Sequence, residues 1–293
     1  MPEGHSIHRL ARQFNDVFAG QSVAVSSPQG RFTEGAQLLD GHRITHAFAH
    51  GKHLFVGFDN ELYLNVHLGI YGAFSFGGDE FFTGASSIGA PRKIGEKEIH
   101  QTDEFSAQPP EPRATTRARL VSDHGWADVV GPTVCRTLTH NEVRQVRSKL
   151  GPDPLNQDAD PHLFYAAAAK TSRPIGVVLM DQKAISGVGN IFRAESLYRC
   201  KVDPFKPGKE CSTDELEALW LDNRHLLEIG VRVGRIITTE TKDRPGVSEE
   251  AAWPEHANYV YQRQGQACPR CGATIRRQEI AARKLYWCPG CQV

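Results

Sequence analysis

Several features that would place the chain in a special class are missing from its sequence. No stretch approaches the ~18 apolar residues that a membrane-spanning helix needs. The first residues lack the basic and then apolar stretch that is typical of a secretory signal, and internal repeats are absent. With 40% hydrophobic and 23% charged residues over 293 positions, the composition predicts a soluble globular protein with room for two domains.

The chain also has no excess of either charge, because 34 basic residues balance 34 acidic ones. A nucleic-acid-binding surface is usually basic, so the net charge does not indicate one, although a local excess would suffice. The seven cysteines are an odd number: Cys135, Cys200 and Cys211 are isolated, and the other four are clustered. An odd count without a secretory signal argues against a disulfide framework and for a reducing compartment.

The first half of the chain has the pattern of a β-rich domain over residues 1–137. Residues 6–18 place apolar side chains on one helical face. Short runs rich in Val, Phe and Tyr follow, broken by glycine, so we expect one helix and then the strands of a sandwich or barrel. Residues 76–116 are rich in Gly, Pro, Ser and charge, and we expect a long, mobile surface insertion between two strands there.

From residue 138 onward the pattern becomes helical. One helix is expected to begin at the N-cap candidate Thr139 and to end before Gly151, and residues 213–233 form an amphipathic pattern with an acidic first turn. The sequence therefore predicts an α+β protein, with a β-domain first, a helical domain over 138–257 and a cysteine-containing segment over 258–293.

The clearest chemical signal is a pair of Cys-x2-Cys motifs, CPRC and CPGC, separated by sixteen residues. Each motif presents two sulfurs from one tight turn, so together they close a tetrahedral four-thiolate zinc site. Four unrelated thiols are a weaker interpretation, and so are two redox-active pairs, because no thioredoxin-like pattern surrounds them. Since protein fills every ligand position, we predict one structural zinc ion. Its ligands would be Cys268, Cys271, Cys288 and Cys291.

Two segments have the character of phosphate-binding elements. The residues between the cysteine pairs have the length of a hairpin and carry four basic residues against one acid, which favours phosphate contact over a merely solubilising rim of charge. Further upstream, Gly-Val-Gly-Asn at 187–190 precedes a helix, where free N–H groups and the Asn190 amide collect anions unless the segment is a plain tight turn. The basic hairpin residues are Arg276, Arg277, Arg283 and Lys284.

Taken together, these segments resemble the formamidopyrimidine-DNA glycosylase / endonuclease VIII family. The similar pieces are MPEG, LGPDPL at 150–155, LMDQKAISGVGNIFRAESLY at 179–198 and the final CPRCG…RKLYWCPGCQ, in an order that matches along nearly the whole chain. The resemblance implies a base-excision repair enzyme with a β-sandwich, a helix–two-turns–helix domain and a zinc finger. Such enzymes flip a damaged base out of duplex DNA, cut its glycosidic bond and nick the strand.

The resemblance also implies roles for individual residues. Pro2, after loss of the initiator methionine, would be the nucleophile, because a terminal amine titrates near pH ~8 and is partly unprotonated at neutral pH. Glu3 would be its acid/base partner, and Lys52, which matches the family's hairpin lysine near the lesion, would be the third catalytic residue. Asn190 and Arg283 match phosphate-binding positions. The competing mechanism is hydrolysis by water, with Glu3 as the base and Pro2 inert.

Three features of the sequence bear on the chemistry or on the choice of lesion. His5 and Ser6 stand where the family often has a proline and a second carboxylate, so His5 either supports the chemistry or is a plain first-turn surface residue. Ile70 and Tyr71 match the hole-filling loop of endonuclease VIII-like members, unless Tyr71 is a core aromatic of a strand. Residues 234–258 are long enough for a lesion-covering loop of the formamidopyrimidine type. We expect oxidised pyrimidines first, then formamidopyrimidines, and 8-oxoguanine last.

Two other classes of protein are alternatives: a non-catalytic zinc-dependent protein that binds damaged DNA, and a structural zinc-ribbon protein of a larger complex. The presence of both Pro2 and Glu3 favours an enzyme, because a decayed binding module has little reason to keep them. We expect a monomer that acts on duplex DNA containing damaged bases or abasic sites. Its expected location is the cytoplasm of a bacterium-like cell, in association with the nucleoid and without a membrane partner.

Overall fold

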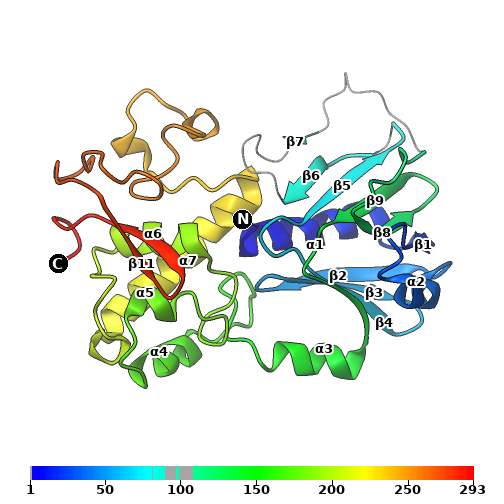
Figure 1. Cartoon of the computed structure of the whole chain (residues 1–293), viewed down its shortest axis with the longest axis horizontal. Coiled ribbons are helices and arrows are strands. Elements are labelled where there is room, and N and C mark those ends of the chain that lie inside the picture. Colours follow the sequence, from blue (N-terminus) through cyan, green and yellow to red (C-terminus); the bar gives the residue numbers. More distant parts are fainter. Residues whose placement is uncertain (1, 81, 90–96, 99–107) are drawn as a thin grey trace. The chain divides into compact units, whose positions relative to one another are not determined.

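The computed structural model describes residues 2–80, 82–89, 97–98 and 108–293 (Figure 1). The chain divides into two compact units, Met1–Ser148 and Lys149–Val293. Across the described ranges, none of the helices combines the length and the apolar character that crossing a membrane requires.

Two antiparallel sheets form the body of the first unit, and they confirm the predicted β-domain as a sandwich-like arrangement. The six-stranded sheet has the order β1-β8-β9-β5-β6-β7, and the four-stranded sheet has the order β10-β4-β3-β2. The strands are β1 (Ala24–Ser26), β2 (Ile44–His50), β3 (His53–Phe58), β4 (Leu62–His67), β5 (Ala73–Gly78), β6 (Ala85–Gly89), β7 (Lys97–Glu98), β8 (Thr116–Val121), β9 (Gly125–Val130) and β10 (Val134–Thr139).

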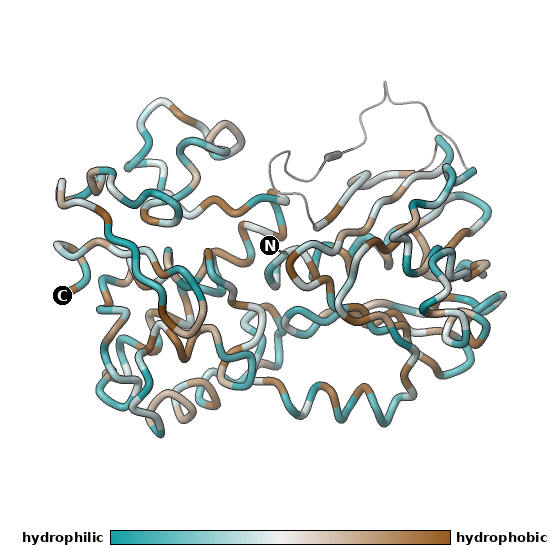
Figure 2. Tube along the Cα trace, viewed as in Figure 1, coloured by the Kyte–Doolittle hydropathy of each residue, from teal (hydrophilic) through white to brown (hydrophobic). Residues whose placement is uncertain are grey.

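The helix α1 (Gly4–Phe18) joins both sheets in one hydrophobic core, as its apolar spacing predicts. The Phe14 ring lies 5.4 Å from that of Phe74 and 5.8 Å from that of Phe76, both in β5, and the same core contains Leu54 and Val56 of β3. Burial of each such side chain stabilises the fold by about 1.5–3 kcal/mol. In Figure 2 the apolar stretches of α1 alternate with polar ones, as this one-sided burial requires. The start of α1, and with it the N-terminal segment, is therefore firmly anchored.

The structure corrects three expectations for this unit. A second helix, α2 (Thr33–Leu39), lies between β1 and β2; it is too short for its period to stand out in the sequence. The predicted insertion at 76–116 contains the end of β5 and all of β6 and β7, while residues 81, 90–96 and 99–107 lie outside the described residues. The boundary predicted at residue 137 falls inside β10, and the unit continues through α3 (His140–Arg147) to Ser148.

The second unit is built from helices followed by a two-stranded hairpin, as predicted. It groups the helical and cysteine-containing segments in one compact body, so their division at residue 257 stays a proposal. Its elements are α4 (Pro161–Ala169), α5 (Ile175–Val178), α6 (Asn190–Arg199), η1 (Gly208–Glu210), α7 (Thr213–Val233), η2 (Thr241–Asp243), η3 (Glu250–Ala252), β11 (Arg276–Ile280) and β12 (Arg283–Trp287).

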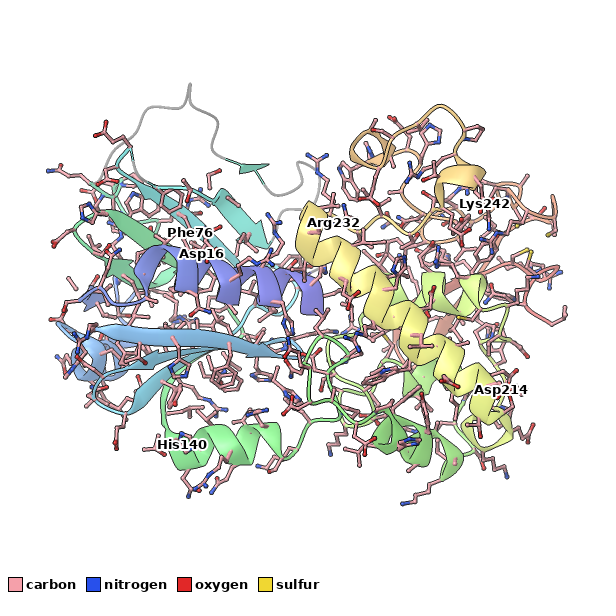
Figure 3. The ribbon with its side chains drawn as sticks, turned by 180° about the vertical axis from the view of Figure 1, so that it is seen from behind. Asp16, Phe76, His140, Asp214, Arg232 and Lys242 are labelled. Carbon is pink, nitrogen blue, oxygen red and sulfur yellow. The ribbon has the colours of Figure 1, made fainter. Side chains whose placement is uncertain are left out.

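The long helix α7 shows how local signals in the sequence define its ends. Ser212 and Glu215 form a reciprocal capping box at its start, and Gly234 ends it with a φ of 74° in the left-handed region. Asp214 lies near the start and Arg232 near the end, where each charge complements the helix dipole (Figure 3). Helices and hairpin share one hydrophobic core, so the hairpin is held by packing as well as by its cysteines.

Candidate functional site

The N-terminal residues lead directly into α1. Glu3 is the N-cap residue, with φ −117° and ψ −177°, and its carbonyl oxygen accepts a hydrogen bond from the Ser6 N–H at 3.1 Å. Pro2 and Glu3 are both buried, and Met1 lies outside the described residues. The backbone of the predicted nucleophile and its acid/base partner is therefore fixed by the start of a helix that is itself buried in the core.

His5 is a buried residue, and the expectation of a plain surface position is therefore wrong. Only 4% of it is exposed, and its Nε2 lies 3.1 Å from the Ser6 hydroxyl. Burial, followed by the charges of Arg9 and His8, lowers the pKa of His5 to about 3. The imidazole is therefore neutral at physiological pH and can both donate and accept a hydrogen bond.

Lys52 lies at the tip of the hairpin that joins β2 to β3. His50 pairs directly with His53, so the loop has two residues, and Gly51 has a φ of 58° at the first of them, as a type II′ turn requires. The rings of His53 and His67 lie 4.9 Å apart. Burial, followed by His67 and Arg136, lowers the pKa of His53 to about 4. Burial and the nearby Lys52 charge also lower the pKa of His67.

Ile70 and Tyr71 project from the turn between β4 and β5. Their exposed fractions are 42% and 83%, so the alternative that Tyr71 is a core aromatic is wrong. The turn is well defined, because Gly72 N–H donates to Leu68 O at 3.0 Å and Gly69 adopts a φ of 67°. A rigid turn thus presents two large apolar side chains to solvent.

Asn190 is the first residue of α6, and a neighbouring arginine fixes its amide. Arg193 donates to Asn190 Oδ1, while the Asn190 amide nitrogen donates to Lys284 O at 3.0 Å. Arg193 also donates to Lys284 O at 3.0 Å and to Gly176 O at 3.3 Å. Arg193 therefore connects the glycine-rich turn to β12. The only sign of this role in the sequence is that Arg193 follows Asn190 by three residues.

Arg283 begins β12, at the tip of the β11–β12 hairpin. Ile280 pairs with it, which leaves Ala281 and Ala282 as a two-residue turn with φ values of 49° and 58°. Arg283 and the other three basic hairpin residues are exposed, as the sequence predicts. Two non-glycine residues in the left-handed region are uncommon and cost roughly 1–2 kcal/mol each, so the fold holds this basic tip in a defined shape.

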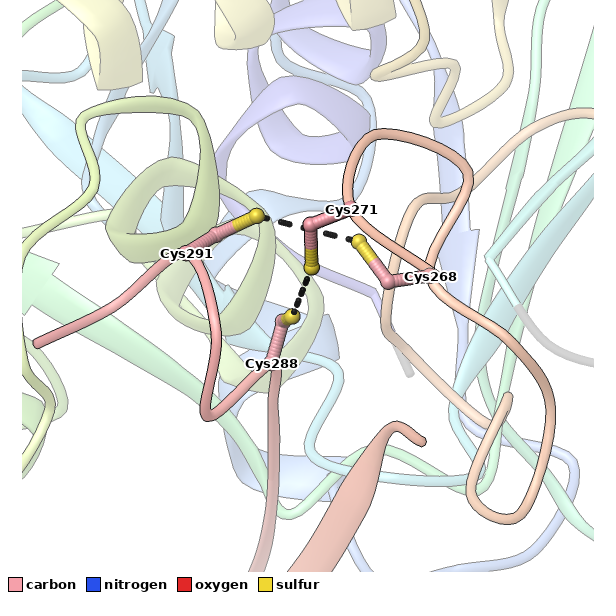
Figure 4. Close-up of side chains that lie close together, drawn as sticks. All are labelled: Cys268, Cys271, Cys288 and Cys291. Carbon is pink, nitrogen blue, oxygen red and sulfur yellow. Dashed lines mark hydrogen bonds between the residues drawn. The ribbon is translucent and has the colours of Figure 1, made fainter. Parts of the chain in front are cut away.

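The four predicted metal ligands lie together at the base of this hairpin (Figure 4). All four sulfurs lie within 4.8 Å of one another, with 3.8 Å between Cys268 and Cys291 and 3.3 Å between Cys271 and Cys288. Four thiolates at the usual Zn–S distance of about 2.3 Å around a tetrahedral ion stand about 3.8 Å apart. The cluster therefore fits one zinc ion, as predicted. Tyr198 adds a hydroxyl 3.2 Å from Cys268 Sγ.

A buried carboxylate that the sequence analysis missed connects α6 to the chain before the cysteines. Glu195 is fully buried and accepts hydrogen bonds from Tyr259 N–H at 2.7 Å, Val260 N–H at 2.8 Å and Tyr261 N–H at 2.7 Å. The Thr238 hydroxyl donates to the same carboxylate at 2.5 Å. The sequence carries no local signal of this role, because α6 is buried on all sides over Asn190–Tyr198 and shows no polar face against which Glu195 would stand out.

Comparison with known proteins assigns the two units and the metal site to a class of nucleic-acid enzymes with a zinc finger. Profiles described as the formamidopyrimidine-DNA glycosylase N-terminal domain, the formamidopyrimidine-DNA glycosylase H2TH domain and a zinc finger found in FPG and IleRS match residues 1–130, 150–242 and 265–293. Endonuclease 8 1 of Mycobacterium tuberculosis is 39% identical over 293 residues, which cover 100% of both chains. Formamidopyrimidine-DNA glycosylase of Thermus thermophilus is 26% identical over 300 residues, covering 100% of this chain and 98% of the relative.

Solved structures agree with this assignment. MutM (Fpg) of Thermus thermophilus has a TM-score of 0.72 at 25% identity, covering 99% of this chain and 98% of that one. Lactococcus lactis Fpg in complex with abasic-site DNA has a TM-score of 0.71 at 19% identity, covering 99% of both chains, and shows the shared fold. The chain belongs to the formamidopyrimidine-DNA glycosylase / endonuclease VIII family, whose members are DNA glycosylases with AP lyase activity.

Removal of one cysteine tests the metal centre. Cys268→Ser is expected to lower bound zinc from one ion per chain to a small fraction and to unfold the hairpin, because a four-thiolate site supplies local folding free energy. Elemental analysis and duplex-DNA titration measure both effects. Cys211→Ser, which changes a half-buried cysteine outside the cluster, is the matched control. Tight DNA binding by a zinc-free protein would contradict the structural role.

Proposed function

We propose that this family member removes oxidised pyrimidines from duplex DNA and nicks the strand by β,δ-elimination through an iminium formed at Pro2. The observation that carries the proposal is the Pro2–Glu3 pair at the start of α1, in a chain that is 39% identical over its full length to an endonuclease 8. The proposal assigns the catalytic roles to this pair and to Lys52, and phosphate contacts to residues of the second unit.

In the proposed mechanism Pro2, freed of Met1, attacks the deoxyribose C1′ and the damaged base departs with the bonding electrons. The Glu3 carboxyl protonates the ring oxygen as the sugar opens, and its carboxylate then stabilises the iminium cation. The cation acidifies the C2′ proton, so loss of that proton expels the 3′ phosphate, and a second elimination expels the 5′ phosphate. The positive end of the α1 dipole lies beside the amine and favours its neutral, nucleophilic form.

Lys52, at the tip of the two-residue hairpin between β2 and β3, is proposed as the third catalytic residue, where it offers a point charge near the lesion. Phosphate binding is proposed for two residues of the second unit: Asn190 lies at the N-terminus of α6, and Arg283 lies at the basic tip of the zinc hairpin. Such contacts position DNA without reading its sequence. The β11–β12 hairpin supplies a local basic excess, with four basic residues against one acid, although the whole chain has a net charge of zero.

The preference for pyrimidines is supported by the exposed pair at the β4–β5 turn. Ile70 and Tyr71 are large, apolar and solvent-facing, which suits side chains that fill the hole left by an everted base. Formamidopyrimidine or 8-oxoguanine excision is a second candidate, because residues 234–258 form a folded segment long enough to contact the lesion. We further propose that the protein acts as a monomer in the bacterial cytoplasm, on nucleoid DNA.

The experiment compares matched duplexes that carry thymine glycol, dihydrouracil, a formamidopyrimidine or 8-oxoguanine, each with borohydride present. We expect single-turnover excision to be fastest on the pyrimidine lesions, with a trapped protein–DNA adduct on each substrate that is cut. Faster excision of the purine lesions would reverse the preference. Excision without any adduct would favour hydrolysis by water, and binding without excision would favour a non-catalytic role.

Arg283→Ala tests the proposed phosphate contact. The change should weaken binding to damaged and undamaged duplexes alike and reduce the dependence of log K on log salt by about one, because one cation–phosphate contact is lost. Fluorescence anisotropy at several salt concentrations measures both quantities. Arg224→Ala, on the exposed Arg224–Glu228 pair of α7, is the control. A change in lesion choice alone would show that Arg283 does not bind phosphate.

A further inference from the structure

Arg270 stands inside the first cysteine motif, between two metal ligands, yet its side chain binds a different part of the second unit. Its Nη2 and Nε lie 3.1 and 3.3 Å from Asp243 Oδ2, and Nη2 lies 3.3 Å from the Tyr259 hydroxyl. Glu240 approaches the same guanidinium at 3.7 Å. The side chain is only 21% exposed, so these charged contacts are largely shielded from water.

Two aromatic rings hold the guanidinium from its side. Its Cζ lies 4.6 Å from the centre of the Tyr259 ring and 5.1 Å from that of Tyr198, within the range of cation–π attraction. The two rings are 4.9 Å apart. Because the Tyr198 hydroxyl lies 3.2 Å from Cys268 Sγ, this aromatic cluster touches the metal site directly. The cysteine motif therefore fixes the backbone of Arg270, and Tyr198 connects its side chain to the metal site.

The partner of Arg270 is a folded loop over residues 238–257. Its base is closed by hydrogen bonds from Thr238 N–H to Ala257 O at 2.8 Å and from the Thr239 hydroxyl to His256 O at 2.6 Å. Ala252 and Ala257 of the loop form a small apolar cluster with Ile237, which directly precedes the loop. This cluster is small, so the loop depends on polar contacts at its edge for much of its order.

Asp243 is the point at which the loop meets the cysteine motif. Burial would raise its pKa, but hydrogen bonds from Tyr259 and Arg270 outweigh burial and lower it. The side chain is 19% exposed, so these donors replace much of the water that would otherwise hydrate the carboxylate. Loss of the guanidinium would leave a largely buried charge with less compensation, which favours opening of the loop.

We propose that Arg270 is a positioning residue that couples occupation of the four-cysteine site to the order of the 238–257 loop. Ligation of the thiolates fixes the backbone of the motif, the motif fixes Arg270, and Arg270 holds Asp243 with its loop. The coupling is a property of the second unit alone. Its consequence for base excision rests on the proposed function.

Hydrogen exchange measured by mass spectrometry tests the coupling in the full zinc-loaded chain. Arg270→Gln should keep one zinc per chain and show at least tenfold faster exchange in peptides covering residues 239–248, with α7 peptides unchanged. Arg224→Gln, which removes an arginine from an exposed pair of the same unit, should leave exchange unchanged. If residues 239–248 of a zinc-loaded Arg270→Gln chain exchanged hydrogen at the native rate, the proposal would be overturned.

Zinc removal from the unmodified chain provides a second test, which holds even if the Arg270→Gln chain fails to fold. After a chelator removes the zinc, residues 239–248 should lose their protection from hydrogen exchange at the same rate as the hairpin residues 272–287. If the hairpin loses protection while 239–248 keeps its native exchange rate, the coupling is refuted.

The loop's part in excision has its own readout. On a duplex with an oxidised base, Arg270→Gln should slow single-turnover excision at least tenfold, whereas nicking of a preformed abasic site should stay within twofold of the unmodified chain. Equal loss of both activities, or loss of neither, would show that the loop does not serve base selection. An unmodified chain that neither excises nor nicks would instead refute the proposed function.

Discussion

Replacing Pro2 by glycine is expected to lower the yield of borohydride-trapped adduct by roughly 10²–10⁴-fold, the usual contribution of a well-placed catalytic group. A secondary amine gives an iminium that has no N–H proton to lose, so its positive charge persists through both eliminations. A primary amine gives an imine that becomes neutral by losing a proton, and it acidifies C2′ less.

The measurement is a gel-based count of covalent complexes formed on duplex DNA with one oxidised pyrimidine. Intact-mass spectrometry must first show that the initiator methionine has been removed, because an amide nitrogen at Pro2 is not a nucleophile. Glu3→Gln serves as the matched variant, since it keeps the amine and removes only the acid. Adduct formation at the native rate by a chain that still carries Met1 would refute catalysis by Pro2.

Local signals made most elements of the chain predictable. The apolar spacing of residues 6–18 anticipated α1, the N-cap candidate Thr139 marked the start of α3, and the amphipathic pattern with an acidic first turn over 213–233 marked α7. The cysteine spacing predicted the metal cluster without any knowledge of the fold, because each Cys-x2-Cys turn already determines half of a tetrahedral site. Where a ligand set or a helix end is encoded within a few residues, sequence reasoning was sufficient.

Contacts that span many residues were not predictable in the same way. Arg193 reaches Lys284 O, and Arg270 reaches Asp243, across 91 and 27 positions of the chain. His5 was uncertain for the same reason, since burial of a first-turn histidine depends on what packs against it. Within residues 76–116 the strands β6 and β7 were not predicted, because the Gly and Pro content of the segment masks strands as short as these. Such contacts depend on the tertiary fold, which local propensity does not encode.

Glu195 offers the second large expected effect, this time on stability. Glu195→Ala should destabilise the second unit by on the order of 3–5 kcal/mol, because it leaves three consecutive backbone N–H groups and one hydroxyl without their acceptor. Urea unfolding followed by tryptophan fluorescence measures the change, because three of the four tryptophans, Trp220, Trp253 and Trp287, lie in the second unit. Glu228→Ala, at an exposed position on α7, is the control and should change stability by about 0.5 kcal/mol or less.

The expected loss of stability is large because the Glu195 carboxylate takes the place of backbone acceptors. Residues 259–261 lie outside the helices and strands of the unit, so their N–H groups have the side chain of Glu195 as an acceptor in place of a ladder of carbonyls. Glu195→Gln should lose less stability than Glu195→Ala, because the amide oxygen remains as one acceptor. It should still be less stable than the unmodified chain, since its NH₂ group faces donors that it cannot satisfy. If both variants unfold at the native urea midpoint, packing of Tyr259 and Val260 in the core holds this segment and the carboxylate contributes little.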